Sequence, residues 1–245
     1  MKLSKRLETV ASMVTKGNRA ADVGCDHGFV PIFLVESGIS PLAVAADVRS
    51  GPLSRAKEHI KEHRLEEKIQ TRLSDGLANI KPGEADSLIM SGIGGILMMR
   101  LLQDEEHTAK SFKELILSPQ SELFDVRRYL VSNGYLIEYE HMLCDEGKYY
   151  FIFHVLVKKD EREWSEEEYR YGKDICKDDM KTFLAYLEKE ERQYEQILEK
   201  MKQAPENDRA AQRIAQLHQD ITCLKKRRQL VYDCGCFIFS RICSY

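Results

Sequence analysis

The stretch Arg19-Ala-Ala-Asp-Val-Gly-Cys-Asp-His-Gly28 decides the fold of this chain. Residues 20–23 are mostly small or β-branched, which is typical of a strand covered on both faces of a parallel sheet. Gly24 and Gly28 then permit backbone conformations and a close ligand approach that a Cβ atom would block. The stretch predicts a buried strand that breaks into a glycine turn at the start of a helix. Nucleotide-like cofactors bind at such turns.

The acidic residues of this turn indicate which ligand it holds. A dinucleotide-binding turn reads Gly-x-Gly-x-x-Gly and presents backbone amides to a pyrophosphate. Here the turn reads Gly-Cys-Asp-His-Gly, with Asp22 just before it and Asp26 inside it. Carboxylates at these positions would repel phosphate and attract a cation. S-adenosylmethionine suits this turn, because it carries an ammonium and a sulfonium group and has no phosphate.

The bulk composition indicates a globular chain. Its 245 residues are enough for one full domain and an appendage, and the 43% hydrophobic content supports a packed core. The apolar runs are short, and the N-terminus lacks the hydrophobic segment of a signal peptide. The seven cysteines include no metal-type Cys-x-x-Cys pair. We therefore expect free thiols, no metal, no membrane segment and a cytoplasmic location.

The charge distribution bears on whether the partner is a nucleic acid. The net charge of -3 argues mildly against one. Residues 1–20, however, carry five Lys and Arg side chains against the single acid Glu8, and this segment leads directly into the glycine turn. It forms either a basic lip beside the cofactor turn or an ordinary solvated helix face.

Strand and helix patterns alternate through residues 1–160. Helices are expected at 3–17, 29–36, 52–63, 96–102 and 122–132, and strands at 20–23, 42–48, 69–74, 86–90, 115–117, 135–143 and 149–157. This order predicts a Rossmann-like, doubly wound α/β sheet that ends in an antiparallel edge hairpin. Ligands of such sheets bind outside the carboxyl ends of the strands.

Residues 161–229 have a different, highly charged composition. Apolar residues recur there at three-four spacing on both sides of the turn Ala204-Pro-Glu-Asn-Asp208, with a break at Glu190. The pattern predicts an antiparallel α-helical coiled-coil hairpin. The hairpin is either a packing or dimerisation arm or a second contact surface for a large substrate. The second reading uses the cations Lys225, Lys226, Arg227 and Arg228. We expect a monomer, with a coiled-coil dimer as the alternative.

The last segment, residues 230–245, leaves this pattern and is rich in Cys, Phe and Ile. Its cysteines lack the spacing and the fourth ligand of a metal site. We expect a disordered or loosely packed tail of unknown role.

Two acidic positions at the ends of later strands suit an adenosine moiety. Asp47 lies a little over twenty residues beyond Gly24, where a carboxylate can accept both ribose hydroxyls. Asp75-Gly76 can place a second carboxylate near the adenine amino group, although Asp-Gly is also a common turn. The first spacing indicates an adenosine ribose and does not by itself select the cofactor.

The remaining candidates concern the acceptor. Asp26 and His27 lie inside the turn, where both could face a transferred methyl group. After the fourth strand the chain reads Ser91-Gly-Ile-Gly-Gly95 and lacks the Asn/Asp-Pro-Pro-Tyr/Phe tetrapeptide often found in enzymes that methylate exocyclic amino groups. An in-ring nitrogen is therefore the better acceptor, although these residues could also be a simple helix-start glycine cluster.

Several of these motifs together resemble the bacterial TrmK-type tRNA (adenine-22, N1)-methyltransferases. The motifs that carry the resemblance are Leu3-Ser-Lys-Arg-Leu7, Asp22-Val-Gly-Cys-Asp-His-Gly28, Ala46-Asp-Val48, Asp75-Gly76, Ser91-Gly-Ile-Gly-Gly95 and Leu117-Ser-Pro-Gln120. The resemblance implies a class I S-adenosylmethionine-dependent methyltransferase sheet followed by the hairpin, through about residue 228. It implies methyl transfer to N1 of one adenine in the D-arm region of tRNA.

The resemblance also assigns roles to residues. By similarity, the cofactor would contact Asp22, Gly24, Cys25, Gly28, Asp47, Val48, Asp75, Gly76, Ser91 and Gly92. Asp26 and His27 would face the acceptor base, and Arg6 would approach the tRNA or the donor. Lys5 would approach the tRNA, and the hairpin would help to hold it.

Other functions stay open at this stage. They are a methyltransferase of a small metabolite, a nicotinamide oxidoreductase, which the missing Gly-x-Gly-x-x-Gly disfavours, and a non-catalytic cofactor-binding module.

Overall fold

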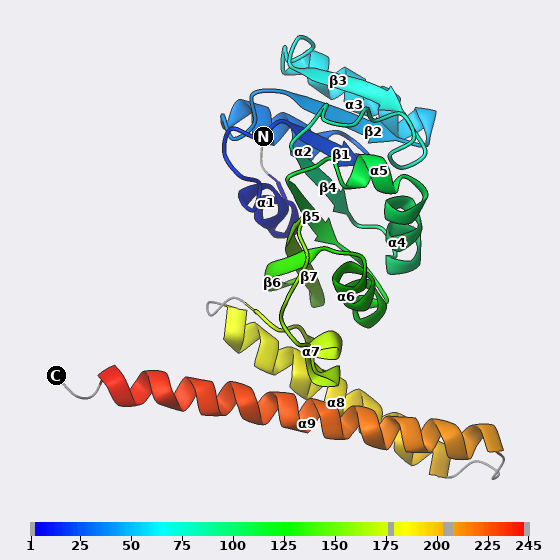
Figure 1. Ribbon diagram of the computed structural model, residues 1–245, viewed down its shortest axis with the longest axis vertical. Coiled ribbons are helices and arrows are strands. Elements are labelled where there is room, and N and C mark those ends of the chain that lie inside the picture. Colours follow the sequence, from blue (N-terminus) through cyan, green and yellow to red (C-terminus); the bar gives the residue numbers. More distant parts are fainter. Residues whose placement is uncertain (1–2, 176–178, 203–207, 243–245) are drawn as a thin grey trace. The chain divides into compact units, whose positions relative to one another are not determined.

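The computed structural model describes residues 3–175, 179–202 and 208–242, with side chains through residue 232 (Figure 1). The chain divides into two compact units, Met1–Arg162 and Glu163–Tyr245. Among the residues described, no helix is both long and apolar enough to cross a bilayer.

The first unit is a seven-stranded sheet in the order β3-β2-β1-β4-β5-β7-β6. The strands are β1 (Ala20–Val23), β2 (Ala43–Asp47), β3 (Ile69–Leu73), β4 (Ser87–Ser91), β5 (Glu114–Ser118), β6 (Leu136–Asp145) and β7 (Lys148–Leu156). The helices are α1 (Lys5–Ser12), α2 (Phe29–Glu36), α3 (Ser50–Glu62), α4 (Gly95–Asp104), α5 (Glu106–Ala109) and α6 (Leu123–Ser132). Strands β1 to β5 pair in parallel and β7 is antiparallel to β5, which confirms the predicted doubly wound sheet with an antiparallel edge.

The central strands are apolar because helices cover both of their faces. Every residue of β1, β2 and β5 is buried. Three helices, α1, α2 and α3, share one core cluster with residues of these strands, among them Ala20, Ala43 and Ala45. Short alanine side chains let the helices pack closely against the sheet. This close packing positions the turns that join the carboxyl ends of the strands to the helices.

One local prediction differs from the structure, and one short helix was not predicted. The first helix ends at Ser12 and not near Gly17, because the Thr15 backbone N–H donates to the Glu114 carboxylate (2.8 Å) and leaves the helical path. No helix lies between β3 and β4, where Arg72 pairs with Glu84 across a run of turns. The short helix α5 was not predicted from the sequence.

Glu114 at the start of β5 joins the segments that support the first turn. Its carboxylate accepts hydrogen bonds from Thr15, from Ser87 on β4 and from Asn18 just before β1 (2.5, 2.5 and 3.2 Å). On β7, His154 Nε2 lies 3.0 Å from the same carboxylate. One buried charge thus connects the N-terminal segment with the neighbouring strands.

The second unit is helical. It contains α7 (Glu166–Tyr171), α8 (Met180–Lys202) and α9 (Asp208–Ile242). Helix α7 begins with a Ser165–Glu168 capping box. Helices α8 and α9 pack through Leu198, Leu217 and Ile221. The backbone of α9 is helical through Ile242, where the sequence led us to expect a disordered or loosely packed tail, and the last three residues of that tail lie outside the described residues.

The break in the hairpin pattern at Glu190 has a structural explanation. Tyr186 donates its hydroxyl to Glu190 (2.6 Å), and Tyr171 and Tyr194 also hydrogen-bond to this carboxylate. Burial raises the pKa of Glu190. A buried carboxylate hydrogen-bonded by three tyrosines therefore takes the place of an apolar contact in the hairpin.

We predict that Glu114→Gln reduces the loss of unfolding free energy that the wild type shows as the pH falls from about 4.5 to about 2. Burial alone would raise the pKa of Glu114, but hydrogen bonds from His154, Ser87 and Thr15 lower it from 4.5 to about 2. Because the folded-state pKa lies below the unfolded one, the carboxylate stabilises the fold above about pH 4.5, and this contribution is lost as the pH falls through 2. The difference corresponds to on the order of 3 kcal/mol.

Urea unfolding between pH 2 and 7 measures this effect. The variant should be less stable than the wild type at pH 7 and nearly equal to it at pH 2. Glu62→Gln, at an exposed position of α3, is the control and should follow the wild type. Parallel profiles for wild type and Glu114→Gln would show that the charge of Glu114 is not coupled to folding.

Candidate active site

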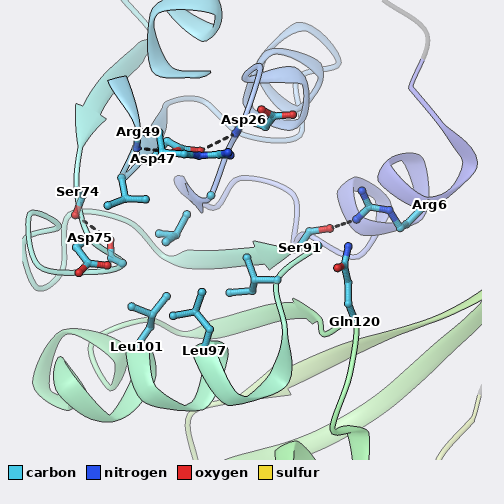
Figure 2. Close-up of a pocket in the computed structure, with 16 residues that line it drawn as sticks. Arg6, Asp26, Asp47, Arg49, Ser74, Asp75, Ser91, Leu97, Leu101 and Gln120 are labelled. Atoms are coloured by element: carbon cyan, nitrogen blue, oxygen red, sulfur yellow. Dashed lines mark hydrogen bonds and ion pairs between the residues drawn. The ribbon is translucent and has the colours of Figure 1, made fainter. Parts of the chain in front are cut away.

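A cavity of about 410 Å³ opens at the carboxyl ends of the parallel strands, beside the reversal of strand order between β1 and β4 (Figure 2). Its lining includes these residues selected from the sequence: Arg6, Gly24, Asp26, Asp47, Val48, Asp75, Gly76, Ser91 and Gly92. It also includes residues that the sequence analysis did not select: Val23, Arg49, Ser74, Ile93, Leu97, Leu101 and Gln120. Segments far apart in the sequence thus meet in one cavity.

The turn after β1 is fixed to the end of β2. The backbone N–H groups of Gly24 and Cys25 both donate to the Ala46 carbonyl (2.9 and 3.0 Å). Gly28 has φ +72°, and a Cβ atom there would lie 3.1 Å from Cβ of Ala56 on α3. Only glycine meets both constraints, so helix α2 can begin close against α3.

Asp47, at the tip of β2, lies on the floor of the cavity. Only 3% of the residue is exposed. Its carboxylate accepts the backbone N–H of Arg49 (2.8 Å) and the backbone N–H of Asp26 (3.3 Å). Each carboxylate oxygen has more than one lone pair, so both can still accept hydrogen bonds from a ligand. This arrangement suits the paired hydroxyls of a ribose.

Asp22 and Cys25 lie behind the cavity and do not line it. Burial, together with the neighbouring Asp47, raises the pKa of Asp22 to about 7, against the opposing effect of Arg6. Burial and the nearby carboxylates raise the pKa of the Cys25 thiol, so it stays protonated near neutral pH. These two residues shape the turn and its electrostatic potential, and Cys25 is not a nucleophile.

Asp26 and His27 are placed differently from one another. Asp26 lines the cavity, has φ +48° and exposes 57% of its side chain. His27 is not in the lining; its Nε2 atom lies 3.5 Å from the Asp26 carboxylate. The imidazole stacks on Phe29 (5.3 Å) and His59 (5.9 Å), and His59 Nδ1 lies 3.0 Å from the His27 carbonyl. His27 therefore braces the turn that presents Asp26.

The turn after β3 forms another wall of the cavity. Ser74 donates its hydroxyl to the Gly76 carbonyl (2.8 Å) and accepts the Asn79 N–H (3.0 Å), which holds Asp75 at the cavity edge. Gly76 has φ +56°, and a Cβ atom there would lie 2.5 Å from Leu101 on α4. The close contact brings the apolar face of α4 into the cavity.

Arg6 reaches the cavity from α1. Its Nη1 donates to the Ser91 hydroxyl at the end of β4 (2.5 Å; Figure 2). Its guanidinium also lies 5.5 Å from the centre of the Tyr150 ring. Lys5 is exposed and does not line the cavity. Among the cations of the predicted basic lip that the structure describes, only Arg6 is in the lining of this cavity.

The four cations of the hairpin all have partners within the second unit. The two lysine side chains are more than half exposed, whereas that of Arg228 is 28% exposed. The partners are Glu191 for Lys225 (3.5 Å) and Arg228, Glu167 for Lys226, and the Lys173 carbonyl for Arg227 (3.1 Å).

The cavity fits an adenosine joined to a cationic group. Asp47 suits the ribose, and the apolar side chains of Val48 and Leu97 can cover a flat ring. The carboxylates of Asp26 and Asp75 add negative charge at the rim, which favours a cation and disfavours a pyrophosphate. Within the described part of the chain, no group of three or more His, Cys, Asp or Glu residues could hold a metal ion.

Comparison with known proteins agrees with this geometry. Residues 3–153 match the family model described as a methyltransferase domain. The chain is 28% identical over 232 residues to a tRNA (adenine(22)-N(1))-methyltransferase of Bacillus subtilis, covering 92% of this chain and 97% of the relative. This chain belongs to the TrmK family. The TrmK fold and its donor, S-adenosylmethionine, are those expected from the sequence.

Two solved structures extend the comparison. A Streptococcus pneumoniae protein in complex with S-adenosyl-L-methionine is 32% identical, with a TM-score of 0.80 over 92% of this chain and 99% of that chain. The M. capricolum TrmK, in complex with S-adenosyl-homocysteine, is 25% identical, with a TM-score of 0.83 over 94% and 100%.

We predict that Asp47→Asn weakens binding of S-adenosylhomocysteine about tenfold or more, the loss typical of one hydrogen bond to a charged group. The two oxygens of Asp47 face two backbone N–H groups, so an amide NH₂ must oppose one of them. Isothermal titration calorimetry measures the change in Kd.

Asp104→Asn is the matched control for this experiment. Its carboxylate is 64% exposed on α4, outside the cavity lining, and its Kd should equal that of the wild type. An unchanged Kd for folded Asp47→Asn would remove Asp47 from the ribose site.

Proposed function

We propose that this protein transfers a methyl group from S-adenosylmethionine to N1 of adenine 22 in tRNA. The observation that carries the proposal is the cavity itself, in which an acidic adenosine site adjoins a polar opening formed by Arg6, Ser91 and Gln120. Membership of the TrmK family supports the choice of acceptor. When bound, S-adenosylmethionine supplies an electrophilic methyl group.

The residues of this chain act mainly by positioning. N1 of adenine attacks through an available lone pair, so a strong general base is unnecessary, and the methylated base carries the positive charge. The cavity holds N1 of the acceptor in line with the methyl–sulfur bond of the donor, and this positioning can supply much of the rate enhancement. The Asp26 carboxylate lies at the cavity edge, where it stabilises positive charge as it develops on the base.

The acceptor base must leave its stack before it can enter the cavity. A base buried in folded tRNA is reached by local opening or by extrusion of the nucleotide. Lys5, exposed at the start of α1 beside Arg6, offers positive charge to the phosphates beside the extruded base. The proposed tRNA contact of the hairpin uses its cations in the same way.

We further propose a cytoplasmic monomer. The apolar layer formed by Leu198, Leu217 and Ile221 packs α8 against α9 of the same chain. These side chains are buried within a single chain and need no second copy to cover them, which favours the monomer over the coiled-coil dimer.

The direct test is nucleoside mass spectrometry of unmodified tRNA after incubation with the protein and S-adenosylmethionine. We expect one N1-methyladenosine per tRNA, and none in a transcript in which adenine 22 is replaced by guanine. Methylation at another position or on another atom would reject the proposed acceptor.

Asp26→Asn should lower kcat by about 100-fold, the scale observed when one group that stabilises transition-state charge is removed. Asn tolerates the positive φ of this position, so the change removes charge and preserves the turn. The Kd of S-adenosylhomocysteine should stay within about threefold of wild type, well below the change expected for a lost charged contact. An unchanged kcat would exclude a catalytic role for Asp26.

The role of the hairpin in tRNA binding is best tested at its exposed cations, Lys225 and Lys226. Lys225→Ala/Lys226→Ala should raise the KM for tRNA about tenfold, equivalent to 1.4 kcal/mol of phosphate contacts, without changing cofactor affinity. The effect should shrink at high salt. Lys200→Ala/Lys202→Ala at the end of α8 is the control, because Lys202 also pairs with a nearby acid, Glu199. Equal KM values for the two double variants would remove Lys225 and Lys226 from the tRNA footprint.

A further inference from the structure

Gln120 is held in a fixed position at the edge of the cavity. It follows β5 and the buried residue Pro119, whose ring restricts the backbone. The Gln120 N–H donates to the Ile93 carbonyl (2.9 Å), and the Gly92 N–H donates to the Ser118 carbonyl (3.1 Å). These two bonds join the turns that follow β4 and β5, so the backbone position of Gln120 is set by both strands.

The side-chain amide of Gln120 is uncommitted. Within the part of the chain that the structure describes, it makes no hydrogen bond, and the residue is exposed. It is also the single amide among the side chains that line the cavity. Ser91, by contrast, already accepts a hydrogen bond from Arg6, and Ser74 is bonded within its own turn.

The amide lies at the acceptor end of the cavity. A Cβ atom on Gly92 would be 3.7 Å from Gln120 Nε2 and 3.6 Å from Arg6 Nη1, so both groups border the same space. Gly92 has φ +85° and keeps that space open. Figure 2 shows Gln120 and Arg6 on one side of the cavity, away from Asp47 and Asp75.

We propose that Gln120 recognises the acceptor adenine by its N6 and N7 atoms; this inference rests on the proposed function. A glutamine amide pairs with adenine in this way, its oxygen accepting from the N6 amino group and its nitrogen donating to N7. These contacts use the Hoogsteen edge. They leave N1, on the Watson–Crick edge, uncovered and directed toward the methyl donor.

The same pairing disfavours guanine. Guanine presents O6 and N7, which are both acceptors, so the amide oxygen of Gln120 would face O6 without a proton between them. Arg6 carries donors alone and the Ser91 oxygen already accepts one hydrogen bond from Arg6, whereas Gln120 offers an uncommitted donor and an uncommitted acceptor on one planar group. Gln120 is therefore a specificity-determining residue.

The test combines a variant of the protein with an atom change in the tRNA. Adenine 22 is replaced by 7-deazaadenine, which keeps N1 and N6 but lacks the N7 acceptor. We expect the wild type to lose about tenfold in kcat/KM on this substrate, the effect of one hydrogen bond. Gln120→Ala should be about tenfold or more slower than wild type on normal tRNA and should show no additional loss on the 7-deaza substrate.

Two further proteins control for indirect effects. Gln120→Glu keeps an acceptor for N6 but has no donor for N7, so it too should be insensitive to the 7-deaza change. Gln103→Ala, at an exposed position of α4 outside the cavity, should retain the tenfold loss of the wild type. The Kd of S-adenosylhomocysteine should be the same for all four proteins.

Three results would overturn the assignment. They are an equal activity of the wild type on both substrates, a tenfold 7-deaza loss that persists in Gln120→Ala, and a tenfold weaker binding of S-adenosylhomocysteine to Gln120→Ala. If the wild type forms no N1-methyladenosine on normal tRNA, the proposed function fails and this inference fails with it. That outcome is distinguishable, because the other three require an active wild type or concern the donor alone.

Discussion

The attachment of the first turn to the end of β2 is the constraint on which the site depends. Ala46 accepts two backbone N–H groups from this turn, and the Asp47 carboxylate accepts a third from Asp26 and a fourth from Arg49. The acidic side chain that suits the ribose is therefore also the group that holds the neighbouring loops. Ligand recognition and local folding share one carboxylate, which leaves this position little freedom to change.

Negative charge concentrates around this attachment. Burial and Asp47 raise the pKa of Asp22, and burial with the same carboxylates raises that of the Cys25 thiol. Burial is the larger cause of both shifts, and the nearby carboxylates, Asp47 among them, add to each, so a further negative charge is costly beside this turn. A sulfonium donor satisfies this condition, whereas a pyrophosphate would meet the same repulsion that the Cys25 thiolate does.

The parts of the site that could be predicted from the sequence are those encoded locally. The strand, turn and helix through residue 36 follow from one continuous stretch, and Asp47 follows from its distance to Gly24. Leu101 and Gln120 could not be recognised in this way, because parallel strand order brings their segments to the cavity from far along the chain. One signal was present for Gln120, since it ends a short polar motif immediately after a predicted strand.

The hairpin shows a similar limit. Its helices follow from the three-four spacing, but four consecutive cations point to different sides of a helix, so their partners depend on the packing of α7 and α8. Glu167 and Glu191 are far from them in sequence. The capping box of α7, in contrast, is a local signal: Ser165 and Glu168 have the spacing of a capping box, and the start of α7 could have been predicted from it.

The two ends of the cavity are built by different means, and this difference matches the two ligands. The proposed donor end consists of turns tied by backbone hydrogen bonds and of glycines with positive φ, so its shape is set before any ligand arrives. The proposed acceptor end consists of the long side chains of Arg6 and Gln120 on a fixed backbone. A small cofactor of constant structure suits the rigid end. A base that must first leave a folded RNA suits side chains that can adjust as it enters, because their hydrogen bonds form only when the correct edge is presented.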